Sequence, residues 1–195
     1  MNIQTKAIRV KTPGLRILLH SFLLAGLLLS FFQTVSAADL RPEMKSHITT
    51  LTALPTANQD NLPAVGDIPF DDRVVVVTFF ASWCPPCLDE FKALNAVNQQ
   101  LGTDNVTIVA LNVFEEFDDN DDVRMEKFLH NTQPEFRVLK GSEESRALFG
   151  GVNRIPTLLV FDRSGNLALN FIHKRGAKKQ SLDASELLGA ISPLL

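Results

Sequence analysis

Two nearly continuous apolar runs predict two buried strands in the middle of the chain. They are "RVVVVTFF" at 73–80 and "VTIVALNV" at 106–113. Runs rich in β-branched and aromatic residues suit strands covered on both faces of a parallel or mixed sheet. Between them a helical stripe recurs at steps of three and four residues, and Gly102 is predicted to end it. The members of this stripe are Cys87, Glu90, Leu94, Val97 and Leu101.

The second half of the chain continues this alternation, which favours an α/β fold. The spacing of Val123 and Phe128 predicts a helix after an acid-rich loop. "TLLVF" at 157–161 and "LALNFI" at 167–172 flank "DRSGN". This pattern predicts an antiparallel hairpin with Gly165 at a positive φ.

Capping signals predict two further helices. Asp183 with Glu186 three residues later predicts a helix that starts there and runs to about Ile191. A short helix is predicted to begin at Pro42, because Pro is favoured in a first helical turn. Its apolar face would carry Met44, Ile48 and Leu51.

The first 37 residues predict an export segment. They contain four basic and no acidic side chains and include the apolar run "ILLHSFLLAGLLLSFF" at 17–32. The run is short for a membrane span of ~20 residues but long for a cleaved signal, so a signal peptide cut after Ala37 and a membrane anchor both stay open. Either one delivers the rest to the periplasm or another extracytoplasmic space, as an N-terminal extension at 38–66 and a domain at 67–195.

The exported part is acidic. Without the four basic residues of the leader, 15 Lys and Arg remain against 22 Asp and Glu, a formal charge of −7 compared with −3 for the whole chain. Nucleic acid is therefore a poor candidate partner. Roughly 155 residues suffice for one domain with its own core.

Cys84 and Cys87 are the only cysteines, and their spacing excludes most structural roles. A disulfide across two intervening residues closes almost no loop in the unfolded chain. A closed zinc site needs four Cys or His ligands, and the four histidines are scattered singly. Leu88 rather than His follows the pair, which excludes covalent haem attachment. Redox chemistry remains, with no cofactor and no metal ion.

The position of the pair at a helix start predicts which sulfur reacts. With Cys84 at the N-cap, Pro85 and Pro86 remove two backbone donors, and the Cys87 N–H becomes the nearest one to the Cys84 sulfur. This donor and the helix dipole would stabilise a Cys84 thiolate. Cys84 is therefore the expected nucleophile and Cys87 the resolving cysteine.

Glu90 lies on the same stripe as Cys87 and has two interpretations. Partial burial would raise the pKa of its carboxyl group, which could then exchange a proton with Cys87 during catalysis. Alternatively, it is an acid in the first helical turn that only complements the helix dipole.

Two other polar features are assigned no chemistry. The acid-rich stretch at 115–122 lacks the Gly and distal Glu of a calcium loop. It is interpreted as a solvated loop in which Asp121 or Asp122 caps the next helix. His173, which two basic residues follow, is interpreted as a solvated strand end.

The motifs "FFASWCPPC" and "NRIPT", some 70 residues apart, resemble those of thioredoxin-like proteins. Together with the export segment, Glu90 and the block "FRVLKGSEESRALFGGVNRIPTLLVFDRSGNL", they are similar to the TlpA/ResA/DsbE group of exported thiol:disulfide interchange proteins. The resemblance covers about residue 74 to the C-terminus. It implies a thioredoxin fold, with a central mixed sheet flanked by helices.

The resemblance also implies roles for residues around the cysteines. Pro156 would be a cis-proline facing them, and a proline directly ahead of a strand independently suits a strand start or edge. Ile155 would offer its backbone to an extended substrate, and Trp83 would shield the rim. Thr78 stands where cytosolic thioredoxins keep a buried Asp, which leaves Glu90 as the proton carrier.

These features predict an extracytoplasmic thiol:disulfide oxidoreductase that reduces disulfides in exported proteins. By resemblance, apocytochrome c thiols are a leading substrate candidate, and a membrane thiol protein would supply electrons. An oxidant or isomerase would use the same residues, but Pro85 and Pro86 offer no charge or donor to lower the pKa of Cys84 further. A copper-binding chaperone of the same fold is a third alternative, although such proteins usually separate their cysteines by three residues.

Overall fold

The computed structural model describes residues 39–116, 120–173 and 176–195, which belong to one compact unit, Ala37–Leu195. The predicted export segment at 1–37 lies outside the described residues. Among the described helices, none is long and apolar enough to span a bilayer. The helices are α2 (Pro42–Thr50), α3 (Pro85–Leu101), α4 (Asp121–Thr132), α5 (Glu143–Leu148) and α6 (Ala184–Ile191), with short 3-10 turns η2 (Gln59–Asn61), η3 (Val65–Asp67) and η4 (Ser192–Leu194). The strands are β1 (Thr52–Ala53), β2 (Val74–Phe80), β3 (Val106–Asn112), β4 (Arg137–Lys140), β5 (Thr157–Phe161) and β6 (Leu167–Ile172).

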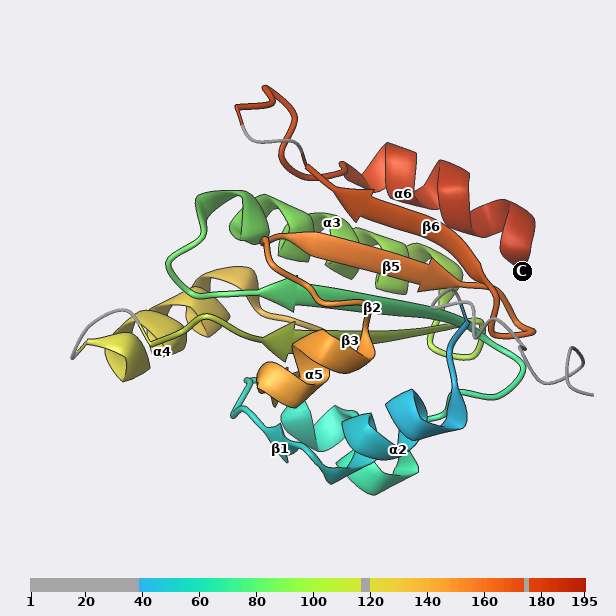
Figure 1. Cartoon of the computed structure of the whole chain (residues 1–195), viewed down its shortest axis with the longest axis horizontal. Coiled ribbons are helices and arrows are strands. Elements are labelled where there is room, and N and C mark those ends of the chain that lie inside the picture. The colour runs from blue at the N-terminus through green and yellow to red at the C-terminus, as the bar shows by residue number, and fades with distance from the viewer. Residues whose placement is uncertain (1–38, 117–119, 174–175) are drawn as a thin grey trace, which may run out of the picture. The chain divides into compact units, whose positions relative to one another are not determined.

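These strands form one sheet in the order β1-β4-β3-β2-β5-β6 (Figure 1). β2, β3 and β4 are parallel, whereas β1, β5 and β6 pair antiparallel with their neighbours, so the sheet is mixed as predicted. Phe80 at the end of β2 lies opposite Asn112 at the end of β3. The carboxyl ends of these strands therefore meet at one edge, where open α/β sheets usually place their sites.

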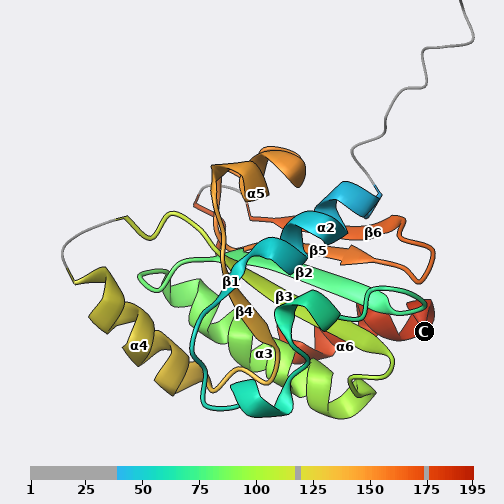
Figure 2. The same cartoon turned by 90° about the horizontal axis from the view of Figure 1, so that it is seen from below.

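The two faces of the sheet are covered by different helices. In β2, the buried apolar residues at even positions pack with α3, α4 and α6, and those at odd positions pack with α2 and the turn after α5. Figure 2 shows these two layers on opposite sides of the sheet. Because side chains alternate along a strand, Thr78 must face α3.

An aromatic cluster fixes α3 and α4 at the end of β2. The ring centroid of Phe80 lies 4.6 Å from that of Phe91 and 5.1 Å from that of Phe128, and the latter two are 4.9 Å apart. Such pairs add about 0.5–1.5 kcal/mol each beyond their burial. The start of α3 is thus firmly placed relative to the strand that leads into it.

Most of the predicted elements are confirmed. The hairpin pairs β5 with β6, and Gly165 has a φ of 84°. Asp183 and Glu186 form the predicted capping box at α6, and Gly102 ends α3 with a φ of 78°. The predicted cap of α4 is wrong, because Asn120 occupies the N-cap position and Asp121 is already the first helical residue.

The described part of the extension predicted at 38–66 contributes a helix and a short strand to the domain. Met44 and Ile48 of α2 are buried in the core cluster on that face, and the following β1 pairs with β4. A strand of two residues carries no sequence period, so it was not predicted. β4 and α5 were also missed, because their four and six residues are too short for a helical or strand pattern.

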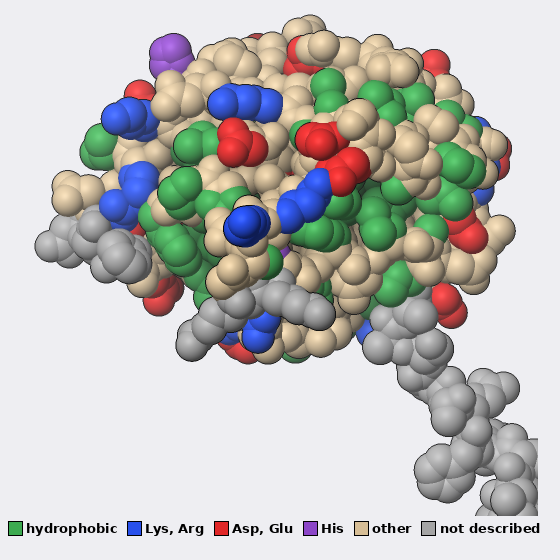
Figure 3. Space-filling view, turned by 90° about the horizontal axis from the view of Figure 1, so that it is seen from above, with side chains coloured by type: hydrophobic (Ala, Val, Ile, Leu, Met, Phe, Trp, Pro, Cys, Tyr) green, Lys and Arg blue, Asp and Glu red, His purple; other side chains and the backbone are tan. Residues whose placement is uncertain are grey.

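Charged side chains of both signs lie on the same face of the domain (Figure 3). On the face shown in Figure 3, acidic and basic side chains are interspersed among apolar ones.

Candidate active site

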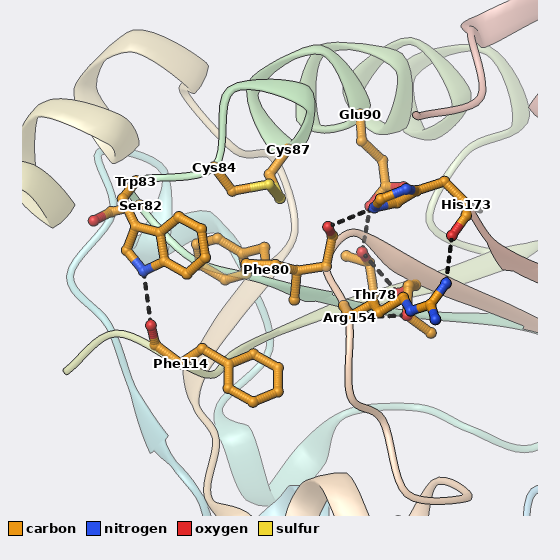
Figure 4. The surroundings of a disulfide bond; sticks show 12 residues. Thr78, Phe80, Ser82, Trp83, Cys84, Cys87, Glu90, Phe114, Arg154 and His173 are labelled. Atoms are coloured by element: carbon orange, nitrogen blue, oxygen red, sulfur yellow. Dashed lines mark hydrogen bonds between the residues drawn. A yellow bond between two sulfur atoms is a disulfide. The ribbon is translucent and has the colours of Figure 1, made fainter. Parts of the chain in front are cut away.

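The two cysteines lie where β2 passes into α3. Cys84 is the N-cap residue of α3, and Pro85 and Pro86 follow it in the first turn, as predicted. A disulfide joins Cys84 to Cys87, with their Cα atoms 5.4 Å apart (Figure 4). Cys84 is 3% exposed and Cys87 is fully buried. Cys84 is therefore the more accessible of the two cysteines, and its sulfur is the one that an approaching molecule can reach first.

The cap of α3 differs from the predicted one. In the disulfide form, the Cys87 N–H donates to the backbone oxygen of Cys84 at 3.1 Å, and the Cys84 sulfur makes no capping hydrogen bond. The sulfur nevertheless stays at the positive end of the helix dipole, which favours a thiolate there after reduction.

Glu90 is buried between α3 and β2. The Thr78 hydroxyl, on the face of β2 that meets α3, donates to its Oε1 (Figure 4). Its other oxygen, Oε2, is buried without a hydrogen-bond partner among the described residues. Burial raises the pKa of Glu90 to about 7, and the Thr78 hydrogen bond opposes part of that rise.

This geometry excludes one of the two interpretations of Glu90. The first turn of α3 contains no acidic residue, and Glu90 is fully buried, so the helix-dipole interpretation is wrong. Residues three apart on a helix are neighbours, which places Glu90 beside Cys87 on one stripe. A carboxyl group that titrates near neutral pH can both accept and return a proton.

Two of the three predicted substrate-binding residues, Ile155 and Pro156, lie directly before β5. The Ile155–Pro156 peptide bond is cis, as the resemblance implies. Thr157 pairs with Phe79, so Pro156 comes just beyond that pair, beside the end of β2 that leads to the cysteines.

The interpretation of His173 as a solvated strand end is wrong. It is half-buried, and its Nε2 lies 3.1 Å from the backbone oxygen of Ile155 (Figure 4). Arg154 donates to the His173 backbone oxygen at 3.4 Å. The Ile155 oxygen therefore already accepts one hydrogen bond and has one further lone pair for another donor.

Trp83 forms part of the rim next to Cys84, and the residues after β3 hold it. It is 37% exposed, and its indole Nε1 donates to the backbone oxygen of Phe114 at 2.7 Å. Glu115 accepts from the backbone N–H of Ser82 at 2.9 Å and also from the Ser82 hydroxyl. Glu115 is thus not part of a solvated loop, contrary to prediction. The sequence could have indicated this contact, because Glu115 follows a predicted strand parallel to the one before Ser82, and the carboxyl ends of parallel strands meet at one edge of a sheet.

Among the residues that the structure describes, no three His, Cys, Asp or Glu side chains cluster closely enough to hold an ion.

Comparisons with known proteins agree with this architecture. The family model described as Redoxin matches residues 37–188. Thioredoxin-T of Drosophila melanogaster is 32% identical over 99 residues, covering 51% of this chain, and the match spans only 58% of that relative's length.

Solved structures show the same fold. A secreted Mycobacterium tuberculosis disulfide oxidoreductase, described as homologous to E. coli DsbE, superposes with a TM-score of 0.57 at 18% identity, covering 79% of this chain and all of that one. A DsbF homologue from Corynebacterium diphtheriae superposes with a TM-score of 0.52 at 25% identity, covering 64% of this chain and 74% of that one.

Proposed function

The chain belongs to the Redoxin family and has the thioredoxin fold, and we propose that it is a thiol:disulfide oxidoreductase that works through Cys84 and Cys87. The observation that carries the proposal is the placement of this pair. Cys84 caps α3 at the edge of the surface, Cys87 is buried behind it, and Glu90 lies on the same stripe of the helix.

The reaction follows from this order of burial. In the reduced protein, the Cys84 thiolate attacks a substrate disulfide, forms a mixed disulfide and releases one substrate thiolate, which takes up a proton. Glu90 takes the proton of Cys87, whose thiolate then attacks the Cys84 sulfur of the mixed disulfide. The second substrate thiolate leaves and is protonated. The substrate gains two electrons and two protons, and the protein ends with the Cys84–Cys87 disulfide.

The direction of electron flow and the place of action are part of the same proposal. Pro85 and Pro86 add no charge or side-chain donor that would make the pair a strong oxidant. The basic and apolar leader at 1–37 supports an extracytoplasmic location, either secreted or tethered. We therefore propose that exported Cys-containing proteins are the substrates, with apocytochrome c a leading candidate. A membrane thiol protein would then reduce the Cys84–Cys87 disulfide again.

Turnover by the full chain tests the proposal. The reduced protein should reduce the disulfides of insulin, and Cys84→Ser should abolish this reduction, while Cys87→Ser should accumulate a mixed disulfide with the substrate. Retained turnover in Cys84→Ser would exclude the proposed nucleophile.

A redox titration against glutathione and dithiothreitol tests the direction. A potential at or below about −220 mV would support a reductant, and one near about −120 mV would indicate an oxidant. Absence of any exchange would favour a binding role instead.

A further inference from the structure

Two consecutive residues after β3, Phe114 and Glu115, hold the two residues that precede the nucleophile. Phe114 accepts the indole N–H of Trp83 through its backbone oxygen, at 2.7 Å. Glu115 accepts both the backbone N–H and the hydroxyl of Ser82. We refer to Phe114 and Glu115 as the rim clamp.

Several hydrogen-bond donors converge on the Glu115 carboxyl group and hold it in place. Besides Ser82, the side-chain amide of Asn112 donates to its Oε2 at 2.6 Å. Ser82 and Asn112 are both buried, at 8% and 6% exposure. A carboxylate accepts through both oxygens, and hydrogen bonds to a charged acceptor are roughly twice as strong as neutral ones. In Glu115→Gln the amide oxygen can still accept at the Oε2 position while the Ser82 hydroxyl turns to accept from the amide NH₂, so the three hydrogen bonds to this side chain become neutral and weaker.

Phe114 is held in a conformation that a bulky residue rarely adopts. Its φ is 59°, in the left-handed region. The Arg146 guanidinium lies 4.3 Å from the centre of its ring, and Arg146 is itself fixed by an ion pair with Glu143 and by a hydrogen bond of 3.2 Å to the Val152 backbone oxygen. Residues in sparsely populated backbone regions persist only where their surroundings determine them, and they concentrate at functional sites.

We propose that the rim clamp positions Trp83 beside Cys84, so that protein substrates dock on a fixed indole and other molecules have little access to the sulfur. This inference rests on the proposed function. The contrast in exposure supports it, because Trp83 is 37% exposed while Cys84 is only 3% exposed. A substrate that approaches Cys84 therefore meets exposed neighbours first, Trp83 before it in the chain and Pro85 after it. Glu115 is a positioning residue, since it acts through Ser82 and Trp83.

The test compares Glu115→Gln with Glu116→Gln in the full chain. Glu116 is the next residue, carries the same side chain and is exposed, so it is the matched control. Trp83 is the only tryptophan of the chain, so fluorescence excited at the red edge of absorption reports on the rim alone. Two further measurements are the rate at which iodoacetamide alkylates Cys84 in a Cys87→Ser background, and the insulin reduction rate in the natural background.

We expect Glu115→Gln to shift Trp83 emission to the red, to speed alkylation and to slow insulin reduction. The two rate changes should be about three- to tenfold, the scale of replacing charge-assisted hydrogen bonds by neutral ones. Glu116→Gln should match the parent protein in all three. If Glu115→Gln does not fold, Ser82→Ala removes only the hydroxyl contact and should give smaller changes in the same directions.

Two results would overturn the clamp. One is that Glu115→Gln behaves like Glu116→Gln throughout, and the other is that it lowers thermal stability while emission and both rates stay unchanged. Failure of the proposed function is distinguishable, because a parent protein without insulin reductase activity would still show the emission and alkylation differences if the clamp exists.

Discussion

Glu90→Gln should remove a large pH dependence of stability. In the folded protein the carboxyl group of Glu90 has a pKa of about 7, whereas its ordinary value is 4.5. Between these pH values the unfolded chain has lost the proton and the folded chain keeps it. Ionisation there favours unfolding, so the contribution of Glu90 to stability falls as pH rises from 4.5 to about 7 and is constant on either side. At about 1.4 kcal/mol per pH unit, the total loss is about 3 kcal/mol.

The structure makes Gln a close mimic of the protonated acid. Its oxygen can accept the Thr78 hydroxyl as Oε1 does, and its NH₂ group would occupy the buried place of Oε2, which has no partner among the described residues. At pH 4.5 the variant should therefore have a stability close to that of the parent, because both carry a neutral polar group there. Above pH 7 it should be more stable by about 3 kcal/mol, because it has no charge to bury.

Urea unfolding of the oxidised protein at several pH values from 4.5 to 8.5 measures this difference. Asp89→Asn is the matched control, since Asp89 is the adjacent acid on α3 but is exposed. Its curve should follow the parent's closely, because the surface ion pair of Asp89 with Lys92 contributes little. Parallel curves for the parent and Glu90→Gln over the whole range would refute the assignment of a raised pKa to Glu90.

Two further predictions concern its neighbour and the sheet edge. Thr78→Val should raise the pKa of Glu90 above about 7, because the lost hydroxyl bond lowers it, and a stability loss that stops at the same pH as in the parent would contradict this. Gly141→Ala should lower the free energy of unfolding by about 1–3 kcal/mol, since the new Cβ would lie 2.7 Å from the Asn112 backbone oxygen and 2.9 Å from Val113 Cγ1. Gly66→Ala, where nothing lies within 4 Å, is the control in the same urea titration, and equal losses would argue against the clash.

Features carried by neighbouring residues could be predicted from the sequence. The cysteine pair at a helix start, the capping box of α6 and the β5–β6 hairpin each depend on residues a few positions apart. Helical periodicity, capping and turn preferences act over that distance, so they can be recognised in the sequence before the fold is known. β1 and β4 could not be predicted, because strands of two and four residues form only when a neighbouring strand is already in place.

The chemical surroundings of the cysteines were decided by tertiary structure. Glu90 meets Thr78 across 12 positions, Glu115 meets Ser82 across 33, and His173 meets Ile155 across 18. Each contact depends on strand register and on which face of the sheet α3 covers. The sequence by itself determined which residues could react and where the helix that presents them begins. The helical stripe already indicated Glu90 as the buried acid, but the tertiary structure alone decided that Thr78 is its partner and that Glu115 holds the rim, because long-range pairing arises only when distant segments pack together.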